Sequence, residues 1–179
     1  MTQTLYPMQL GGGLFLICIG TGIAVGALLG LHWLMYGVVA GAIIGFASIV
    51  GSARAAAARR GRPTRAQVYI MYMAIALEVA AFVALSASGY LATWPVRTQW
   101  IVVLVVVAAH FLIMRFSHGP WIMWLGLATM TWLAVSSFTP LSLDPIVAVD
   151  GLLKAIFGLM MAKPLLQPLP RATPDSAGR

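Results

Sequence analysis

The sequence predicts an all-α, polytopic integral membrane protein: a single domain with about six transmembrane helices. Of its 179 residues, 61% are hydrophobic and only 8% are charged, whereas soluble domains carry about 25% charged residues. The mean hydropathy is +0.94. Long apolar runs recur along the chain and are separated by short segments rich in Gly, Pro and basic residues. Strands of a membrane β-barrel would instead alternate over about 10 residues, so the pattern favours helices.

The first apolar stretch extends from Gly11 to Ser52. As one helix it would be about 60 Å long at ~1.5 Å per residue, twice the thickness of the hydrocarbon core. We therefore expect it to fold back near Gly30–Tyr36, where His32 and Trp33 have the amphipathic character of a membrane interface. This predicts helices over about 11–31 and 34–52.

Four further apolar segments follow the Arg/Ala/Gly/Pro segment 52–64. They predict helices over about 65–91, 98–116, 120–138 and 146–162, with turns at Gly89–Pro95, Ser117–Pro120 and Thr139–Pro145. Pro120 suits the first turn of a helix, where its missing N–H removes no hydrogen bond. The transmembrane domain is thus expected to cover 1–162, and the Pro-rich polar segment 163–179 to form a cytoplasmic tail without regular structure.

Basic residues are distributed very unevenly between the two predicted sides of the membrane. Arg97 stands alone on one side, and Lys154 lies within the last predicted helix. The other nine lie on the opposite side: Arg54, Arg59, Arg60, Arg62, Arg65, Arg115, Lys163, Arg171 and Arg179. The positive-inside rule then predicts that both termini are cytoplasmic. The net charge of +7 is read as this topology signal, so we expect a multi-pass protein of the bacterial inner membrane whose partner is the lipid bilayer and not nucleic acid.

Glycines recur at four-residue intervals in the first two predicted helices, as in a glycine zipper. Residues four apart share a helix face, and glycine there allows two backbones to approach closely. The simplest interpretation is a tightly packed hairpin of these two helices; the alternative is that one stripe faces another subunit or lines a narrow pore. The stripes are Gly22, Gly26 and Gly30, and Gly37, Gly41 and Gly45.

Few ionisable residues lie inside the predicted spans. Each costs about 2.5–3.5 kcal/mol on insertion scales, so each is a functional hypothesis with an expected partner. Glu78 lies near the middle of the third helix, and Asp150 and Lys154 share one face of the sixth. The candidate polar residues are Glu78, His110, Lys154, Asp150, Arg115 and His118.

Depth estimates suggest that three of these residues meet. At ~1.5 Å per residue, Glu78 lies about 16–20 Å from the cytoplasmic boundary, Lys154 about 10–13 Å and His110 about 9 Å. If their helices are neighbours, Glu78 and Lys154 can form an ion pair with His110 close by, which could relay a proton. The rival interpretation is purely structural, with these pairs, or an Asp150–Lys154 pair within one helix, only neutralising buried charge.

No motif predicts an enzyme, a metal site or a cofactor. Cys18 is the only cysteine, so no cysteine cluster for zinc or iron–sulfur ligation is present. A haem held by two histidines is disfavoured because His110 and His118 are eight residues apart on one helix or its end, and His32 is expected at the opposite surface. The Gly11–Gly13 run is followed by no lysine and begins a membrane helix, so it is not a phosphate loop.

The residues His110-Phe111, His118-Gly119, Asp150-Gly151, Lys154 and Phe157-Gly158 resemble the pattern of a bacterial family of small, uncharacterised multi-pass membrane proteins. The resemblance covers roughly the last three predicted helices. It implies no activity, and it places His110, His118, Asp150 and Lys154 among the positions of interest.

Two functional hypotheses follow. In the first, the protein is a small transporter or channel that could be linked to proton movement, with Glu78, His110 and Lys154 around a polar path. Six helices leave little room for a cavity, so a homo-oligomer is expected. In the second, it is a non-catalytic accessory or assembly subunit that packs against a larger membrane complex through its glycine faces.

Overall fold

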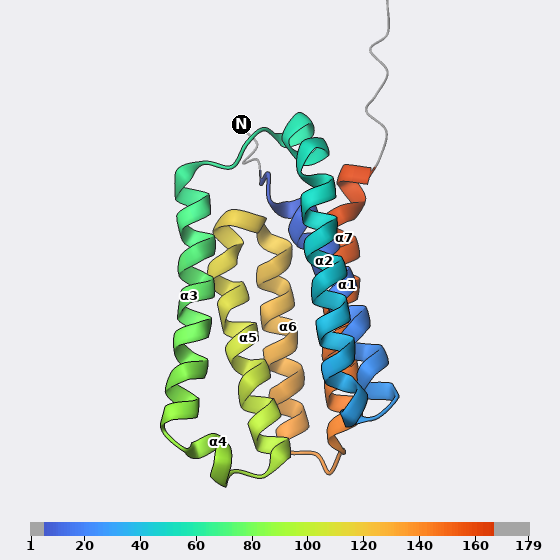
Figure 1. Ribbon diagram of the computed structural model, residues 1–179, viewed down its shortest axis with the longest axis vertical. Coiled ribbons are helices and arrows are strands. Elements are labelled where there is room, and N and C mark those ends of the chain that lie inside the picture. Colours follow the sequence, from blue (N-terminus) through green and yellow to red (C-terminus); the bar gives the residue numbers. More distant parts are fainter. Residues whose placement is uncertain (1–5, 167–179) are drawn as a thin grey trace, which may run out of the picture.

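The chain forms an all-helical bundle (Figure 1). The computed structural model describes residues 6–166, apart from the side chains at 55, 59, 60 and 164–166. Seven helices follow one another within that part of the chain. They are α1 (Gln9–Leu28), α2 (Leu31–Arg60), α3 (Arg65–Ala87), the single turn α4 (Tyr90–Thr93), α5 (Val96–His118), α6 (Pro120–Ser137) and α7 (Leu143–Leu166).

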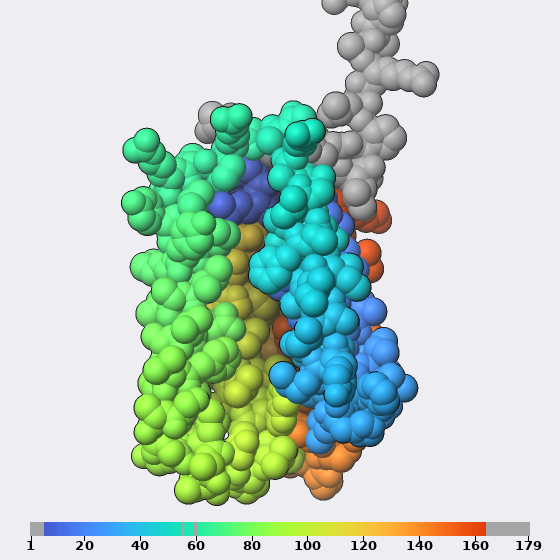
Figure 2. Space-filling model, in the orientation of Figure 1, coloured from blue at the N-terminus to red at the C-terminus, as the bar shows by residue number. Residues whose placement is uncertain are grey.

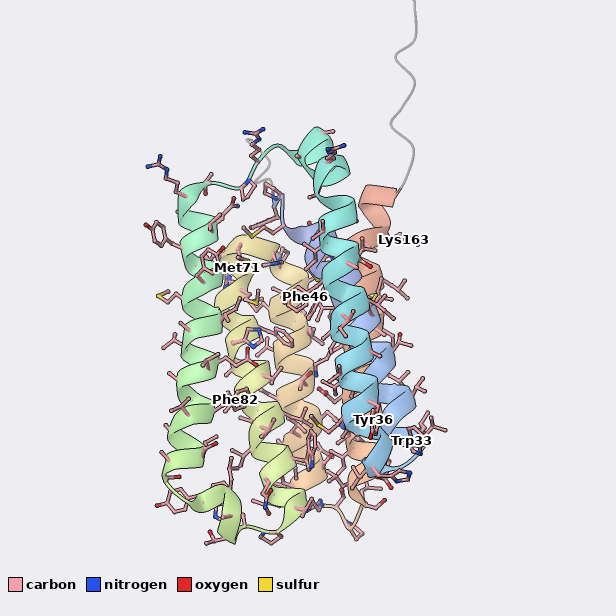
Figure 3. All side chains as sticks on the ribbon, in the orientation of Figure 1. Trp33, Tyr36, Phe46, Met71, Phe82 and Lys163 are labelled. Carbon is pink, nitrogen blue, oxygen red and sulfur yellow. The ribbon has the colours of Figure 1, made fainter. Side chains whose placement is uncertain are left out.

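Five of these helices, α1, α2, α3, α5 and α7, are long and apolar enough to cross a membrane. The sixth predicted span corresponds to α6, which has 18 residues and so extends about 27 Å, close to the ~30 Å of the hydrocarbon core. Trp and Thr recur along it. Trp33 and Tyr36 lie exposed near the end of the bundle where α1 meets α2 (Figure 3), as expected for interfacial aromatic residues. The chain is therefore a membrane protein.

One half of the bundle consists of α1, α2 and α7. Helix α1 lies between the other two and packs against both. Its contact with α2 is backbone to backbone. A Cβ atom at Gly37 would lie 2.1 Å from the carbonyl oxygen of Gly22, and a Cβ at Gly41 would lie 2.7 Å from the carbonyl oxygen of Cys18. Further along, Gly26 faces the backbone of Leu34. These four glycines thus let the two helices touch where any side chain would separate them.

A second glycine contact joins α1 to α7. A Cβ at Gly20 would lie 2.5 Å from the carbonyl oxygen of Gly151, and one at Gly13 would lie 2.8 Å from that of Gly158. The pairs are seven residues apart on both helices, which returns each glycine to the same helix face after two turns. The Asp-Gly and Phe-Gly pairs of the family resemblance therefore include the two α7 glycines that hold this helix against α1.

The second half of the bundle consists of α3, α5 and α6, with α5 between the other two. Two long-range contacts fix the lower loops of Figure 1. The Arg97 guanidinium donates to the carbonyl oxygens of Ser136 and Thr139, which lie at the C-terminal end of α6. The indole N–H of Trp132 donates to the carbonyl oxygen of Ile146 at 3.0 Å, joining α6 to α7. Arg97, alone on its side of the predicted membrane, thus ties the start of α5 to the carbonyl groups at the end of α6.

Several helix ends differ from the predicted bounds. α2 continues to Arg60 instead of ending near 52, because its Ala/Arg segment consists of strong helix formers and the first breaker is Gly61, with a φ of 75°. α5 includes His118, which the sequence assigned to a turn, and α7 extends from Leu143 to Leu166, beyond the predicted 146–162. The rest of the predicted tail, 167–179, lies outside the described residues.

Gly30 was predicted to continue the first glycine stripe, and this is wrong. It lies in the turn between α1 and α2 with a φ of 109°, a conformation that glycine adopts without strain. A Cβ there would approach only the ring of His32. Its contribution is the reversal of the chain, while the neighbouring stripe residues make the helix contact.

Candidate functional site: a cavity inside the bundle

A cavity of about 460 Å³ lies between the two halves of the bundle. Its two outer walls are α2 and α3, and α1, α5, α6 and α7 contribute residues behind them. Figure 2 shows this opening as a groove between the α2 and α3 surfaces, with atoms of α5 and α6 visible at its floor. Phe46 of α2 and Met71 of α3 lie on its two sides (Figure 3).

The cavity wall is almost entirely apolar. Four polar side chains contribute to it, namely Glu78, His110, His118 and Lys154. An apolar cavity of a few hundred Å³ with a few convergent polar groups is the usual form of a small-molecule site. Apart from Gly12, the apolar wall consists of Phe15, Leu16, Ile19, Ile23, Val38, Phe46, Ile49, Met71, Ile75, Val107, Phe111, Met114 and Ile122.

Glu78 and His110 face each other across the contact between α3 and α5. Glu78 lies one helical turn after Ala74, the fully buried residue of α3, and therefore on the same inward face. Its Oε2 atom is 3.1 Å from Nδ1 of His110, and the two side chains are 19% and 11% exposed. The N–H direction of His110 is not aligned with the carboxylate as in a full hydrogen bond. The pair is thus close, partly open to the cavity, and able to exchange its contact for another partner.

Lys154 pairs with Asp150 one turn earlier on α7. Asp150 is completely buried and Lys154 is 3% exposed. The Lys154 Nζ atom donates to Oδ2 of Asp150 and lies 6.0 Å from the centre of the Phe111 ring. Oδ1 of Asp150 has no hydrogen-bond partner among the described residues. A buried ion pair of this kind neutralises both charges, and removal of either partner leaves the other unpaired.

The predicted convergence of Glu78, His110 and Lys154 on one space is observed, with a different pairing. Lys154 contacts Asp150, and Glu78 contacts His110. Among the described residues no ion pair joins Glu78 to Lys154, although Lys154 is near enough to interact electrostatically with both Glu78 and His110. The Asp150–Lys154 pair within α7, which the sequence analysis gave as the purely structural interpretation, therefore forms, and Glu78, His110 and Lys154 still share one cavity.

His118 lies at the far end of the cavity from this cluster. Its Nδ1 atom is 2.8 Å from the hydroxyl oxygen of Ser117, and the ring is 5% exposed. A Cβ at Gly12 would lie 2.4 Å from Cδ2 of His118, so the glycine provides the space that the ring occupies. Arg115, the remaining candidate, is exposed; its guanidinium lies 5.0 Å from the Phe116 ring centre and outside the cavity wall.

Among the described residues, no three His, Cys, Asp or Glu side chains are grouped so that they could hold a metal ion. The single thiol, Cys18, is half-buried, and its sulfur lies 3.9 Å from the hydroxyl oxygen of Ser48 on α2. The chemistry available at the cavity is therefore that of one carboxyl, two imidazoles and one ammonium group.

Sequence reasoning missed the apolar residues of the cavity, in particular Phe15 and Phe46, whose ring centres are 5.0 Å apart. No signal in a membrane sequence separates them, because residues facing lipid, core or cavity are all apolar. Gly12 was also missed, and the adjacent glycines in the Gly11–Gly13 run gave no indication that only one of them accommodates an imidazole ring.

Comparison with known families identifies the chain's relatives. The profile of a family of unknown function, DUF6609, matches residues 2–165. The chain belongs to this family. The match covers all six predicted helices and agrees with the resemblance to an uncharacterised family noted for the last three. No curated protein and no solved structure matches the chain.

Proposed function

We propose that this protein is a small proton-linked membrane transporter whose binding site is the cavity between α2, α3 and α5. The observation that carries the proposal is the placement of Glu78, His110 and Lys154, from three different helices, on one apolar cavity in the membrane interior. Ionisable groups at this depth are costly and typically mark substrate or proton pathways.

The Glu78–His110 contact supports proton coupling. Both groups exchange protons, they lie 3.1 Å apart, and both are partly accessible from the cavity. The Asp150–Lys154 pair is more deeply buried and supports a positioning role, since it keeps an ammonium group at the cavity wall without leaving its charge unpaired.

The same proposal includes an orientation in the bacterial inner membrane with both termini in the cytoplasm. The described ends of the chain, Tyr6 and Leu166, lie at the same end of the bundle as the α2–α3 loop (Figure 1). Arg54, Arg62 and Arg65 are exposed at this end of the bundle. The positive-inside rule favours its placement in the cytoplasm.

An accessory or assembly role is the second hypothesis, and it required glycine faces available to a partner. Gly22, Gly26, Gly37 and Gly41 contact the chain's own helices, which weighs against docking through them. A homo-oligomer stays a prediction. The cavity lies within a single chain, so transport does not depend on a second copy.

The proposal is tested in proteoliposomes that contain a trapped pH indicator. A panel of lipophilic solutes in three charge classes (cations, neutral molecules and anions) is added outside the vesicles. Proton movement is followed for the wild type, Glu78→Gln and Asp144→Asn. Asp144 lies at the start of α7, outside the cavity wall, so its variant controls for a carboxyl-to-amide change.

We expect at least one class to drive proton movement in the wild type and in Asp144→Asn, with at least a tenfold loss in Glu78→Gln. The transport proposal fails if no class moves protons through correctly folded wild-type protein. It also fails if Glu78→Gln transports as well as the wild type.

A further inference from the structure

The negative and positive charges of the groups at the cavity are unequal in number. Two carboxyl groups, Glu78 and Asp150, accompany a single ammonium group, Lys154. His110 and His118 add no charge while they are neutral. One negative charge is therefore in excess when both carboxyls are ionised, and an uncompensated charge inside a membrane protein is strongly unfavourable.

Glu78 carries this excess negative charge. Asp150 is fully buried behind the cavity wall and already contacts Lys154, whereas Glu78 lines the cavity and has only the poorly aligned contact with His110. The excess charge can be removed in two ways: a proton binds to Glu78 or His110, or a cation occupies the cavity beside the carboxylate.

The rest of the wall suits a large apolar cation. Phe15, Phe46 and Phe111 come from three different helices, and aromatic faces attract cations that have lost their hydration shell. Small hydrated metal cations would instead require several oxygen ligands, and among the described residues Glu78 is the only carboxyl group in the wall. The polar and apolar features together fit a singly charged organic cation with a large hydrophobic surface.

Access from the bilayer fits the same class of ligand. The opening between α2 and α3 faces sideways, along the length of two helices that can span the membrane (Figure 2). Lipophilic cations partition into membranes, so they can reach this opening without first crossing a polar vestibule.

We propose that the cavity binds a monovalent lipophilic cation at Glu78 in exchange for one proton. This inference rests on the proposed transport function and specifies its substrate class. The exchange balances: the protonated site releases H⁺, the carboxylate that remains pairs with the cation, and the reverse reaction restores the proton when the cation leaves. Cation and proton compete for one site, so each lowers the affinity of the other by the same factor.

Other titratable and charged groups near Glu78 also affect the binding of the cation and the proton. His110 and His118 face the cavity from α5, and Lys154 faces it from α7 with Asp150 behind. The described cavity residues of α1, α2 and α6 are apolar or glycine. Lys154 would repel a cation, but its charge is compensated by Asp150, and the repulsion is therefore reduced. If the ammonium group dominated instead, the cavity would prefer an anion.

Two probes of the same shape and opposite charge separate these cases. Binding of tetraphenylphosphonium and of tetraphenylborate is measured by equilibrium dialysis on purified, full-length protein in detergent, over a range of pH. We expect tetraphenylphosphonium to bind more tightly, with an affinity that rises towards tenfold per pH unit while the site is protonated. Glu78→Gln should weaken binding at least tenfold and remove its pH dependence, whereas Glu78→Asp should keep both in part.

Equal or tighter binding of tetraphenylborate would overturn the inference, as would cation binding that is independent of pH or unchanged in Glu78→Gln. If Glu78→Gln does not fold, the wild-type pH series and Glu78→Asp still decide. Failure here is distinguishable from failure of the transport proposal. Anion-driven proton movement in proteoliposomes would keep transport and reject the cation, while cation binding without proton movement across the membrane would keep the site and reject transport.

Discussion

Substitution of Gly37 by alanine tests the packing of α1 against α2 most sharply. The new Cβ would lie 2.1 Å from the carbonyl oxygen of Gly22. Ordinary van der Waals contact begins at 3.4 Å, so the two backbones must separate by 3.4 − 2.1 = 1.3 Å at this point. The obstacle is backbone and cannot rotate away. Overpacking of this kind typically costs about 1–3 kcal/mol, and we expect a loss in the upper part of that range.

Gly51 provides the matched control because it lies on the same helix and a Cβ there would meet nothing within 4 Å. Alanine at an exposed helical position is favoured over glycine by about 0.8–1.0 kcal/mol. The same chemical change should therefore lower the free energy of unfolding at Gly37 and raise it slightly at Gly51. The assay is equilibrium unfolding by SDS in mixed micelles, followed by circular dichroism. Equal effects at the two positions, or an unchanged stability for Gly37→Ala, would refute the close-contact interpretation.

Three further predictions concern buried charge, loop anchoring and orientation. Lys154→Met should destabilise the bundle by about 3–5 kcal/mol because it leaves Asp150 unpaired, and adding Asp150→Leu should recover part of that loss in the same unfolding assay; a double variant no more stable than the single one would contradict the pairing. Arg97→Ala removes charged donors from two carbonyl groups and should cost about 1.5–3 kcal/mol, with faster hydrogen exchange in the α6–α7 loop; unchanged exchange there would argue against the anchor. In a cysteine-free background, Arg62→Cys should react with an impermeant maleimide only from the cytoplasmic side and Thr93→Cys only from the other, and the reverse pattern would invert the proposed orientation.

Composition predicted a membrane protein, and the long, continuously apolar runs predicted helices in place of the alternating strands of a β-barrel. The helix ends were harder to predict. Continuation of α2 to Arg60 was missed because basic residues beside a membrane span were read as a loop, although Ala and Arg are good helix formers. Gly30 was placed both on a stripe, by its spacing, and at the start of the expected fold-back, and its φ of 109° shows that it belongs to the turn.

The candidate site was partly predictable for a physical reason. Ionisable residues are so costly in the bilayer that their presence draws attention to Glu78, His110 and Lys154, and helix rise alone places them at depths close enough for their side chains to meet. The sequence left both the Glu78–Lys154 pair and the Asp150–Lys154 pair open, since the choice depends on the rotation of α3, α5 and α7 about their own axes. Asp150 lies on the same helix face as Lys154, one turn away, and this local contact forms in place of one across the bundle.

The glycine contacts between α1 and α7 illustrate the same limit. A four-residue repeat is conspicuous in a sequence, and it drew attention to the α1–α2 interface. The pairs Gly13 with Gly158 and Gly20 with Gly151 repeat at seven residues, and this spacing is easily lost among the eighteen glycines of the chain.

Proton release on binding of the cation tests the central claim most directly. Tetraphenylphosphonium is added to purified protein in weakly buffered detergent solution at a pH where the site is protonated, and the released protons are counted with a pH indicator against the amount of ligand bound. One proton per bound cation in the wild type, and none in Glu78→Gln, is the result expected if Glu78 is the shared site. Cation binding with no proton release from the wild type would contradict it.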